Sequence, residues 1–172
     1  DKTNNLCGTC RPRFFRGVPT FVLKLINITI PHNAYFGEKD WQQLEVVRTM
    51  THDLNMNISI VGKPIVRDKD GLAMSSRNGY LSEEDRSKAL SLSKALELAQ
   101  NLVIKGERSA ENIRTEIRKV IEQKQGTEID YISVCDPESF TEQTEIKSKV
   151  LVALAVRVGS TRLIDNRIIG KF

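Results

Sequence analysis

The sequence Ala34-Tyr35-Phe36-Gly37-Glu38-Lys39-Asp40 decides the fold prediction. Its first three residues are a short apolar run, which predicts a buried strand. Apolar residues then recur at helical spacing and predict a helix: Trp41, Leu44, Val47, Met50 and Leu54. Asn55-Met56-Asn57 interrupts this pattern, and Ile58–Val61 predicts the next strand. Strand, loop, helix and strand in this order form half of a doubly wound α/β sheet.

Upstream of this stretch, the spacing predicts a helix from about Gly17 to Pro31, because proline cannot continue a helix. Its expected apolar face consists of Phe21, Val22, Leu25, Ile26 and Ile28. Residues 6–15 contain glycine, proline and several arginines, and this composition predicts a loop.

The composition is that of a globular protein. The chain has 172 residues, 40% hydrophobic and 28% charged, enough for one ordinary domain or two small ones. No apolar stretch reaches the length of a bilayer, and the polar N-terminus has no signal-peptide core, so we expect a cytoplasmic protein without a membrane partner. The net charge of +4 comes from charges of mixed sign along the chain, which argues against nucleic acid as a partner.

Cys7 and Cys10 form a single C-x-x-C pair. A zinc site needs two further ligands close by, and only Cys135, His32 and His52 remain, scattered along the chain. We therefore predict reduced thiols and no metal site built from protein ligands. The two histidines are expected to have structural roles.

The loop Gly37–Asp40 follows a strand at its carboxyl end, where ligands bind in doubly wound sheets. The ammonium group of Lys39 can reach a polyphosphate there. From its position alone, Asp40 is expected to cap the following helix, although its carboxylate could also bind a sugar hydroxyl. Either Gln42 or Gln43 should face the loop, and Gln42 is the one expected on the plain helix surface.

A second loop, Met74–Asn78, follows the turn signal Asp68-Lys69-Asp70-Gly71. Ser75 and Ser76 offer hydroxyl and backbone N–H groups, and Arg77 offers a planar five-donor fork, a combination that suits a triphosphate. Met74 could lie on a base. The alternative is a serine-rich turn with a surface arginine, because short loop motifs often match by chance.

A domain boundary is predicted near Gly79, separating residues 1–78 from a small α+β domain of residues 79–172. Ser82 should cap a helix that stops at Gly106, and a second helix should follow Ser109. Three strands are expected after the helices: Asp130–Val134, Val150–Val158 and Arg162–Ile164. The Gly159-Ser160 link is so short that the last two must pair antiparallel.

These loops, together with further motifs, make the sequence resemble the pantothenate synthetases (pantoate–β-alanine ligases) from Leu6 to the C-terminal region. The motifs are Leu6-Cys7-Gly8, Arg11-Pro12, Phe15-x-Gly17-Val18, Thr20, Lys24-Leu25, Phe36–Asp40 with Gln42-Gln43, Val61-Gly62, Arg67, Asp70–Asn78, Leu81 and Arg162–Asn166.

The resemblance implies a Rossmann-like nucleotidylyltransferase domain followed by a smaller C-terminal domain that covers the site. It implies that ATP and pantoate form pantoyl adenylate with release of pyrophosphate, and that β-alanine then displaces AMP. Mg²⁺ would accompany the phosphates, and a homodimer would be the usual assembly.

By position, the resemblance places ATP against Gly37, Glu38, Lys39 and Asp40, with Lys39 on the phosphates. A second ATP loop would consist of Met74, Ser75, Ser76 and Arg77, and the catalytic residues would be Lys39, Ser75, Ser76 and Arg77. The backbone of Val66 would meet the adenine, and Gln43 would hold pantoate.

The chain departs from the family pattern in two ways. Arg13-Phe14 stands where the family usually has Gly-His, and the family's His-x-Gly-His motif would lie upstream of this sequence. We therefore expect the later portion of a ligase, with little or no activity on its own. The alternatives are a non-catalytic nucleotide-binding or dimerisation module and an aminoacyl-tRNA synthetase fragment, although the latter would need a basic RNA-binding surface.

Overall fold

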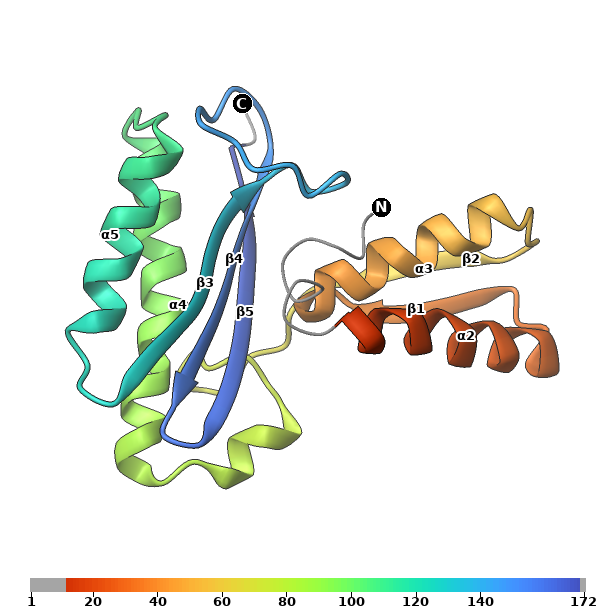
Figure 1. Ribbon diagram of the computed structural model, residues 1–172, viewed down its shortest axis with the longest axis horizontal. Coiled ribbons are helices and arrows are strands. Elements are labelled where there is room, and N and C mark those ends of the chain that lie inside the picture. Colours follow the sequence, from red (N-terminus) through yellow and green to blue (C-terminus); the bar gives the residue numbers. More distant parts are fainter. Residues whose placement is uncertain (1–11, 171–172) are drawn as a thin grey trace. The chain divides into compact units, whose positions relative to one another are not determined.

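The structure is a computed structural model that describes residues 12–170, and its chain divides into two compact units (Figure 1). The division falls between Ile65 and Val66, earlier than the boundary expected near Gly79. Residues 66–78 group with the C-terminal unit because Arg67, for example, is hydrogen-bonded to Asp165 of that unit. The two units are described separately below.

The N-terminal unit is a β–α–β arrangement preceded by a helix. Strands β1 and β2 pair in parallel, with Ala34 opposite Ile60 and Phe36 opposite Gly62. Parallel neighbours need a crossover connection, and the helix α3 supplies it. The α/β prediction for this region is therefore confirmed. The elements in chain order are α2 (Pro12–Thr29), β1 (Asn33–Gly37), the 3-10 helix η1 (Glu38–Asp40), α3 (Trp41–Asp53) and β2 (Ser59–Lys63).

Helix α2 begins at Pro12, five residues before the expected start at Gly17. Proline fits the first helical position because the N–H it lacks would have no partner there. The loop predicted for residues 6–15 is thus wrong for 12–15, and residues 6–11 lie outside the described part. On the predicted apolar face Ile26 is buried, whereas Phe21 and Ile28 are exposed.

The strand β1 is less buried than its apolar sequence predicts. Tyr35 is 62% exposed, and no residue of β1 is buried. Parallel sheets are normally covered on both faces. In the described part of this unit the sheet has only two strands, so it cannot enclose an apolar strand as a full doubly wound sheet does.

Helix α3 packs through Leu44 and Val47, which are fully buried as their spacing predicts. Leu54, expected in the same stripe, is exposed because it lies just past the last helical turn. The next residue, Asn55, has a φ of 49°. This left-handed conformation is tolerated best by glycine and asparagine, and here it accompanies the end of the helix.

The C-terminal unit is a three-stranded antiparallel sheet in the order β3-β4-β5, with two long helices. The predicted cap is confirmed, since Ser82 Oγ accepts a hydrogen bond from the Asp85 N–H at 3.0 Å. The second helix follows Ser109 as predicted, and Ser109 caps it by accepting a hydrogen bond from the Asn112 N–H at 3.3 Å. The elements are η2 (Ser76–Tyr80), α4 (Glu83–Ile104), α5 (Ala110–Glu122), β3 (Thr127–Cys135), β4 (Val150–Val158) and β5 (Thr161–Ile169).

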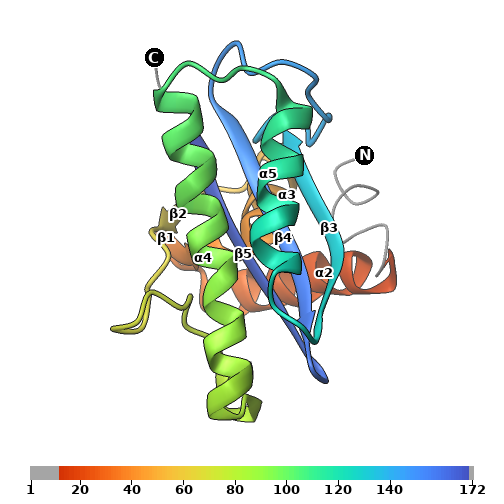
Figure 2. The same ribbon diagram turned by 90° about the vertical axis from the view of Figure 1, so that its left-hand side faces the viewer.

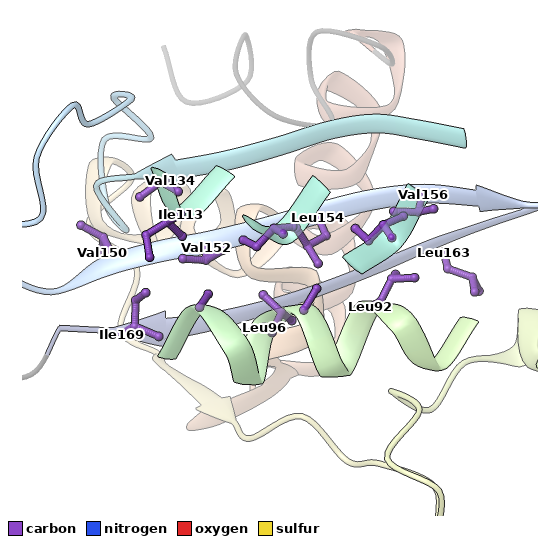
Figure 3. Close-up of a cluster of buried hydrophobic side chains, with 14 of the residues drawn as sticks. Leu92, Leu96, Ile113, Val134, Val150, Val152, Leu154, Val156, Leu163 and Ile169 are labelled. Atoms are coloured by element: carbon purple, nitrogen blue, oxygen red, sulfur yellow. The ribbon is translucent and has the colours of Figure 1, made fainter. Parts of the chain in front are cut away.

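Helices α4 and α5 lie side by side on one face of this sheet (Figure 2). Between helices and sheet lies one continuous apolar core (Figure 3). Leu92 and Leu96 of α4 and Ile113 of α5 face Val152 and Leu154 of the central strand β4, all essentially inaccessible to solvent. Within residues 12–170, no helix combines the length and the apolar character needed to cross a bilayer.

Candidate nucleotide-binding loops

The first loop lies between the carboxyl end of β1 and the start of α3. Gly37 is the last residue of β1, and Glu38, Lys39 and Asp40 form the single turn η1 that leads into the helix. The placement expected from the sequence, at the carboxyl end of a parallel strand, is therefore what the structure shows. In open α/β sheets, ligands bind at this end of the strands.

Gly37 is a glycine that neither the backbone nor the packing requires. Its φ of −72° and ψ of 131° are extended values that any residue adopts. A Cβ atom added there would meet no heavy atom within 4 Å. The space beside the Gly37 Cα is thus open within the described part of the chain, and a ligand could approach the backbone closely there.

Asp40 occupies the N-cap position of α3 but makes no side-chain capping hydrogen bond. The expectation that this carboxylate caps the helix is therefore wrong. Its φ of −97° and ψ of 55° differ from the β-region values of an ordinary cap. The carboxylate is exposed at the start of a helix, where a negative group is electrostatically favoured.

Of the two glutamines after the loop, Gln42 differs from expectation. Gln42, expected on the helix surface, is buried, and its Oε1 has no hydrogen-bond partner among the described residues. Gln43 is half-buried. Because neighbouring helix positions point about 100° apart, the rotation of α3 decides which of the two enters the interior, and the apolar spacing alone did not reveal that rotation.

Glu38 and Lys39 are both half-buried rather than fully solvated. The Glu38 carboxylate points toward β2, since its Oε1 lies 3.1 Å from the place of a Cβ on Gly62. The Arg48 guanidinium of α3 reaches the same point, at 3.2 Å. The first loop is thereby packed against both the next strand and the crossover helix of its own unit.

The second loop belongs to the C-terminal unit. Met74, Ser76 and Arg77 are exposed, Met74 to 52%. Ser75 is half-buried, and its Oγ accepts a hydrogen bond from the Arg77 N–H at 3.3 Å, which starts the short 3-10 helix η2. The loop therefore presents hydroxyl groups and a guanidinium to solvent on an ordered turn.

Val66 is 65% exposed, and its carbonyl accepts a hydrogen bond from the Met74 N–H at 2.9 Å. The residue expected at the adenine is thus directly linked to the first residue of the second loop. A carbonyl oxygen has a second lone pair, so this bond leaves capacity for a ligand.

The cysteines and histidines offer no metal site in the described part of the chain, where no group of three potential ligands is found. Cys7 and Cys10 lie outside the described residues. Cys135 is buried, and this burial raises the pKa of its thiol to about 11. His52 is exposed beside Asp53, with 3.3 Å between Nδ1 and Oδ1.

The chain thus combines a parallel α/β unit, which has an open loop at the carboxyl end of β1, with an α+β unit, which has an exposed Ser76-Arg77 turn. A family model described as pantoate-beta-alanine ligase matches residues 1–168. The chain belongs to this family.

Among its relatives, the pantothenate synthetase of Acetivibrio thermocellus is 54% identical over 167 residues, and that of Thermotoga petrophila is 51% identical over 168. These alignments cover 97% and 98% of this chain but only 59% and 60% of the relatives. The chain therefore spans about three fifths of the length of these relatives.

Two solved structures show the same fold. The crystal structure of pantothenate synthetase from Thermus thermophilus has a TM-score of 0.92 at 38% identity. The alignment covers 96% of this chain and 60% of the Thermus chain. A pantoate-beta-alanine ligase from Francisella tularensis, complexed with beta-gamma ATP and beta-alanine, has a TM-score of 0.69 at 30% identity and covers 97% of this chain and 55% of its own.

Proposed function

We propose that this chain is part of an enzyme that condenses pantoate with β-alanine at the expense of ATP. The observation that carries the proposal is the pair of loops, with open space beside Gly37 in the first and an exposed Ser76-Arg77 turn in the second, in a member of this family. The ligands named for the Francisella structure support ATP and β-alanine as substrates.

In the first step, a carboxylate oxygen of pantoate attacks the α-phosphorus of ATP, and the bond to pyrophosphate breaks. In the second step, the β-alanine amine attacks the acyl carbon, loses a proton and expels AMP. The activation is needed because a carboxylate is a poor electrophile until its oxygen carries a good leaving group.

Positive side chains are assigned to the phosphates. Lys39 and Arg77 neutralise the charge that develops on the departing pyrophosphate, and the hydroxyl groups of Ser75 and Ser76 donate hydrogen bonds to phosphate oxygens. These four residues are proposed as the catalytic groups. Mg²⁺ would supply additional charge on the phosphates, a mode of binding that needs few protein carboxylates.

The remaining contacts serve binding. Gly37, Glu38 and Asp40 line the ATP site together with Met74, whose thioether is suited to a base face. The Val66 backbone meets adenine, and Gln43 holds pantoate. A neutral amide can bind hydroxyl and carboxylate groups without adding charge.

The proposal includes the organisation of the whole enzyme. As a functional division, distinct from the structural division after Ile65, residues 1–78 would supply the ATP and pantoate contacts, and residues 79–172 would form the smaller C-terminal domain. The enzyme would act as a homodimer in the cytoplasm, and the 172 residues alone would have little or no turnover.

The test is a pyrophosphate-release assay with pantoate, β-alanine and Mg-ATP, run on the full-length product of the gene that encodes this chain. Lys39→Ala and Arg77→Ala should each raise the activation free energy of adenylate formation by about 3 kcal/mol and so slow this step. Arg118→Ala is the control, since Arg118 is an exposed α5 residue paired with Glu122. ATP binding without turnover would instead favour a non-catalytic module, and unaltered kinetics in both loop variants would refute the phosphate assignment.

A further inference from the structure

A network of ion pairs and hydrogen bonds inside the C-terminal unit holds the second loop in place. The network begins at Arg67, whose guanidinium forms a two-pronged pair with Asp165 of β5, Nη1 to Oδ2 at 2.7 Å and Nη2 to Oδ1 at 3.0 Å. Nη1 also donates to the Gly71 carbonyl at 3.1 Å. One guanidinium thus ties the segment before the loop to the sheet.

The Asp165 side chain is only 2% exposed, so this pair is largely removed from water. Burying two charges costs desolvation energy that their attraction often only offsets, so such pairs contribute little net stability. What a two-pronged pair does supply is a defined orientation, because the planar fork matches the carboxylate at two points.

A second arginine holds the same segment from α4. Arg86 donates from Nε to Asp70 Oδ2 at 2.8 Å and from Nη2 to Asp68 Oδ2 at 2.8 Å. Asp70 Oδ1 in turn accepts the Leu72 N–H at 3.2 Å. The turn that precedes the loop is therefore fixed to the helix as well as to the sheet.

Asn78 closes the loop at its other end. Its Nδ2 donates to the Ala73 carbonyl at 3.1 Å and to Asp68 Oδ2 at 3.4 Å. Ala73 and Asn78 are the residues on either side of Met74–Arg77, so one side-chain amide holds the two ends of the loop together. Both partners are acceptors, which fixes the orientation of the amide.

We propose that Arg67, Asp165, Arg86, Asp68 and Asn78 are positioning residues for the reaction, and that they set the placement of Ser75, Ser76 and Arg77 on the triphosphate. This inference rests on the proposed function. A misplacement of reacting groups by about 1 Å can cost on the order of a hundredfold in rate. Because the side chains of Ser76 and Arg77 are exposed, their precise placement depends on the residues that hold the loop at its two ends.

Two isosteric variants test the proposal in the full-length gene product. Asn78→Asp replaces the donor with a carboxylate that faces Asp68 and the Ala73 carbonyl, and Asp165→Asn weakens the fork to Arg67. We expect each to lower kcat/KM for ATP by about tenfold or more, while the KM for β-alanine stays unchanged.

Asp130→Asn is the matched control. It weakens the ion pairs of Asp130 with Arg162 and Arg157 in the same sheet, and none of these three residues belongs to the network that holds the second loop. A purely structural role predicts that Asp165→Asn and Asp130→Asn alter thermal stability and kinetics alike, and that result would overturn the proposal.

A readout independent of turnover is hydrogen exchange in the 172-residue chain. Exchange of the amides at 74–77 should accelerate in Asn78→Asp and Asp165→Asn but not in Asp130→Asn, and equal exchange in all three would refute the positioning role. Failure of the unmodified enzyme to form pantothenate would reject the proposed function and this inference together. Normal turnover with unaltered ATP kinetics in both variants would reject this inference alone.

Discussion

Glu38 and Gly62 are close neighbours in the N-terminal unit: Glu38 Oε1 lies 3.1 Å from the point that a Cβ on Gly62 would occupy. Leu44 Cδ2 lies 3.0 Å from that point and Arg48 Nη2 3.2 Å. The absence of a side chain at Gly62 is thus what allows the first loop and α3 to pack on β2.

Gly62→Ala should destabilise the N-terminal unit by about 1–3 kcal/mol, the usual cost of overpacking. The measurement is urea unfolding of the 172-residue chain followed by the fluorescence of Trp41, its only tryptophan. An unchanged unfolding midpoint would show that Leu44, Arg48 and Glu38 move aside without cost.

Gly37→Ala is the matched substitution at an open position. Its added methyl group meets no heavy atom within 4 Å and its φ suits alanine, so the unfolding midpoint should stay within experimental error. If Gly37 lines the ATP site, the same variant of the full-length gene product should bind ATP at least several-fold more weakly. Unweakened binding, measured by calorimetry, would remove Gly37 from the site.

The lowered pKa of Asp136 predicts that the free energy of unfolding depends measurably on pH. The Ser139 and Glu138 N–H groups donate to its Oδ1 at 2.7 and 3.0 Å, and the Ser139 bond is the main cause that holds the pKa of this carboxyl below its ordinary 3.8. Because the unfolded state binds the proton more readily, the ionised group stabilises the fold above its unfolded pKa. This contribution is lost as the pH falls through the lowered folded pKa.

Asp136→Asn keeps an oxygen acceptor but cannot titrate, so its stability should fall less steeply than that of the unmodified chain between about pH 5 and about pH 2. Thermal unfolding followed by circular dichroism measures the difference, with Glu138→Gln, an exposed residue of the same turn, as control. Parallel curves for Asp136→Asn and the unmodified chain would contradict the prediction.

Cys135 should be an unreactive thiol in the folded protein. It is fully buried, and burial raises the pKa of the thiol to about 11, so the reactive thiolate is scarce near pH 8. In a Cys7→Ser/Cys10→Ser background, Ellman's reagent should modify Cys135 slowly without denaturant and rapidly in urea. Equal rates in both conditions would show that the β3 edge opens readily.

Local sequence was sufficient for much of the fold. Apolar periodicity and capping residues, which act over one or two turns, were enough to predict the strand–loop–helix–strand order around Gly37–Asp40. They also predicted the helices after Ser82 and Ser109. The short Gly159-Ser160 link likewise required an antiparallel pair. The start of α2 was missed because Pro12, placed among glycine and arginines, resembles loop sequence as much as a helix start.

The side-chain geometry of the first loop and of the start of α3 could not be predicted from the sequence. Asp40 stands where a cap is expected and yet makes no capping bond, and Gln42 enters the interior in place of an apolar residue. The burial of Gln42 depends on the rotation of α3, which the apolar stripe alone does not fix. The missing cap accompanies the backbone of Asp40, whose φ of −97° and ψ of 55° differ from those of an ordinary cap.

By itself, the sequence determined which segments are helix, strand and anion-suited loop, because hydrophobic spacing, caps and turn residues are local properties of the chain. Only the tertiary structure decided how the Ser-Ser-Arg turn is held: Arg67 meets Asp165, 98 positions away. Such a pairing depends on strand register and on helix packing across the whole unit. The sequence near Arg67 or near Asp165 contains no periodic pattern from which the pairing could be predicted.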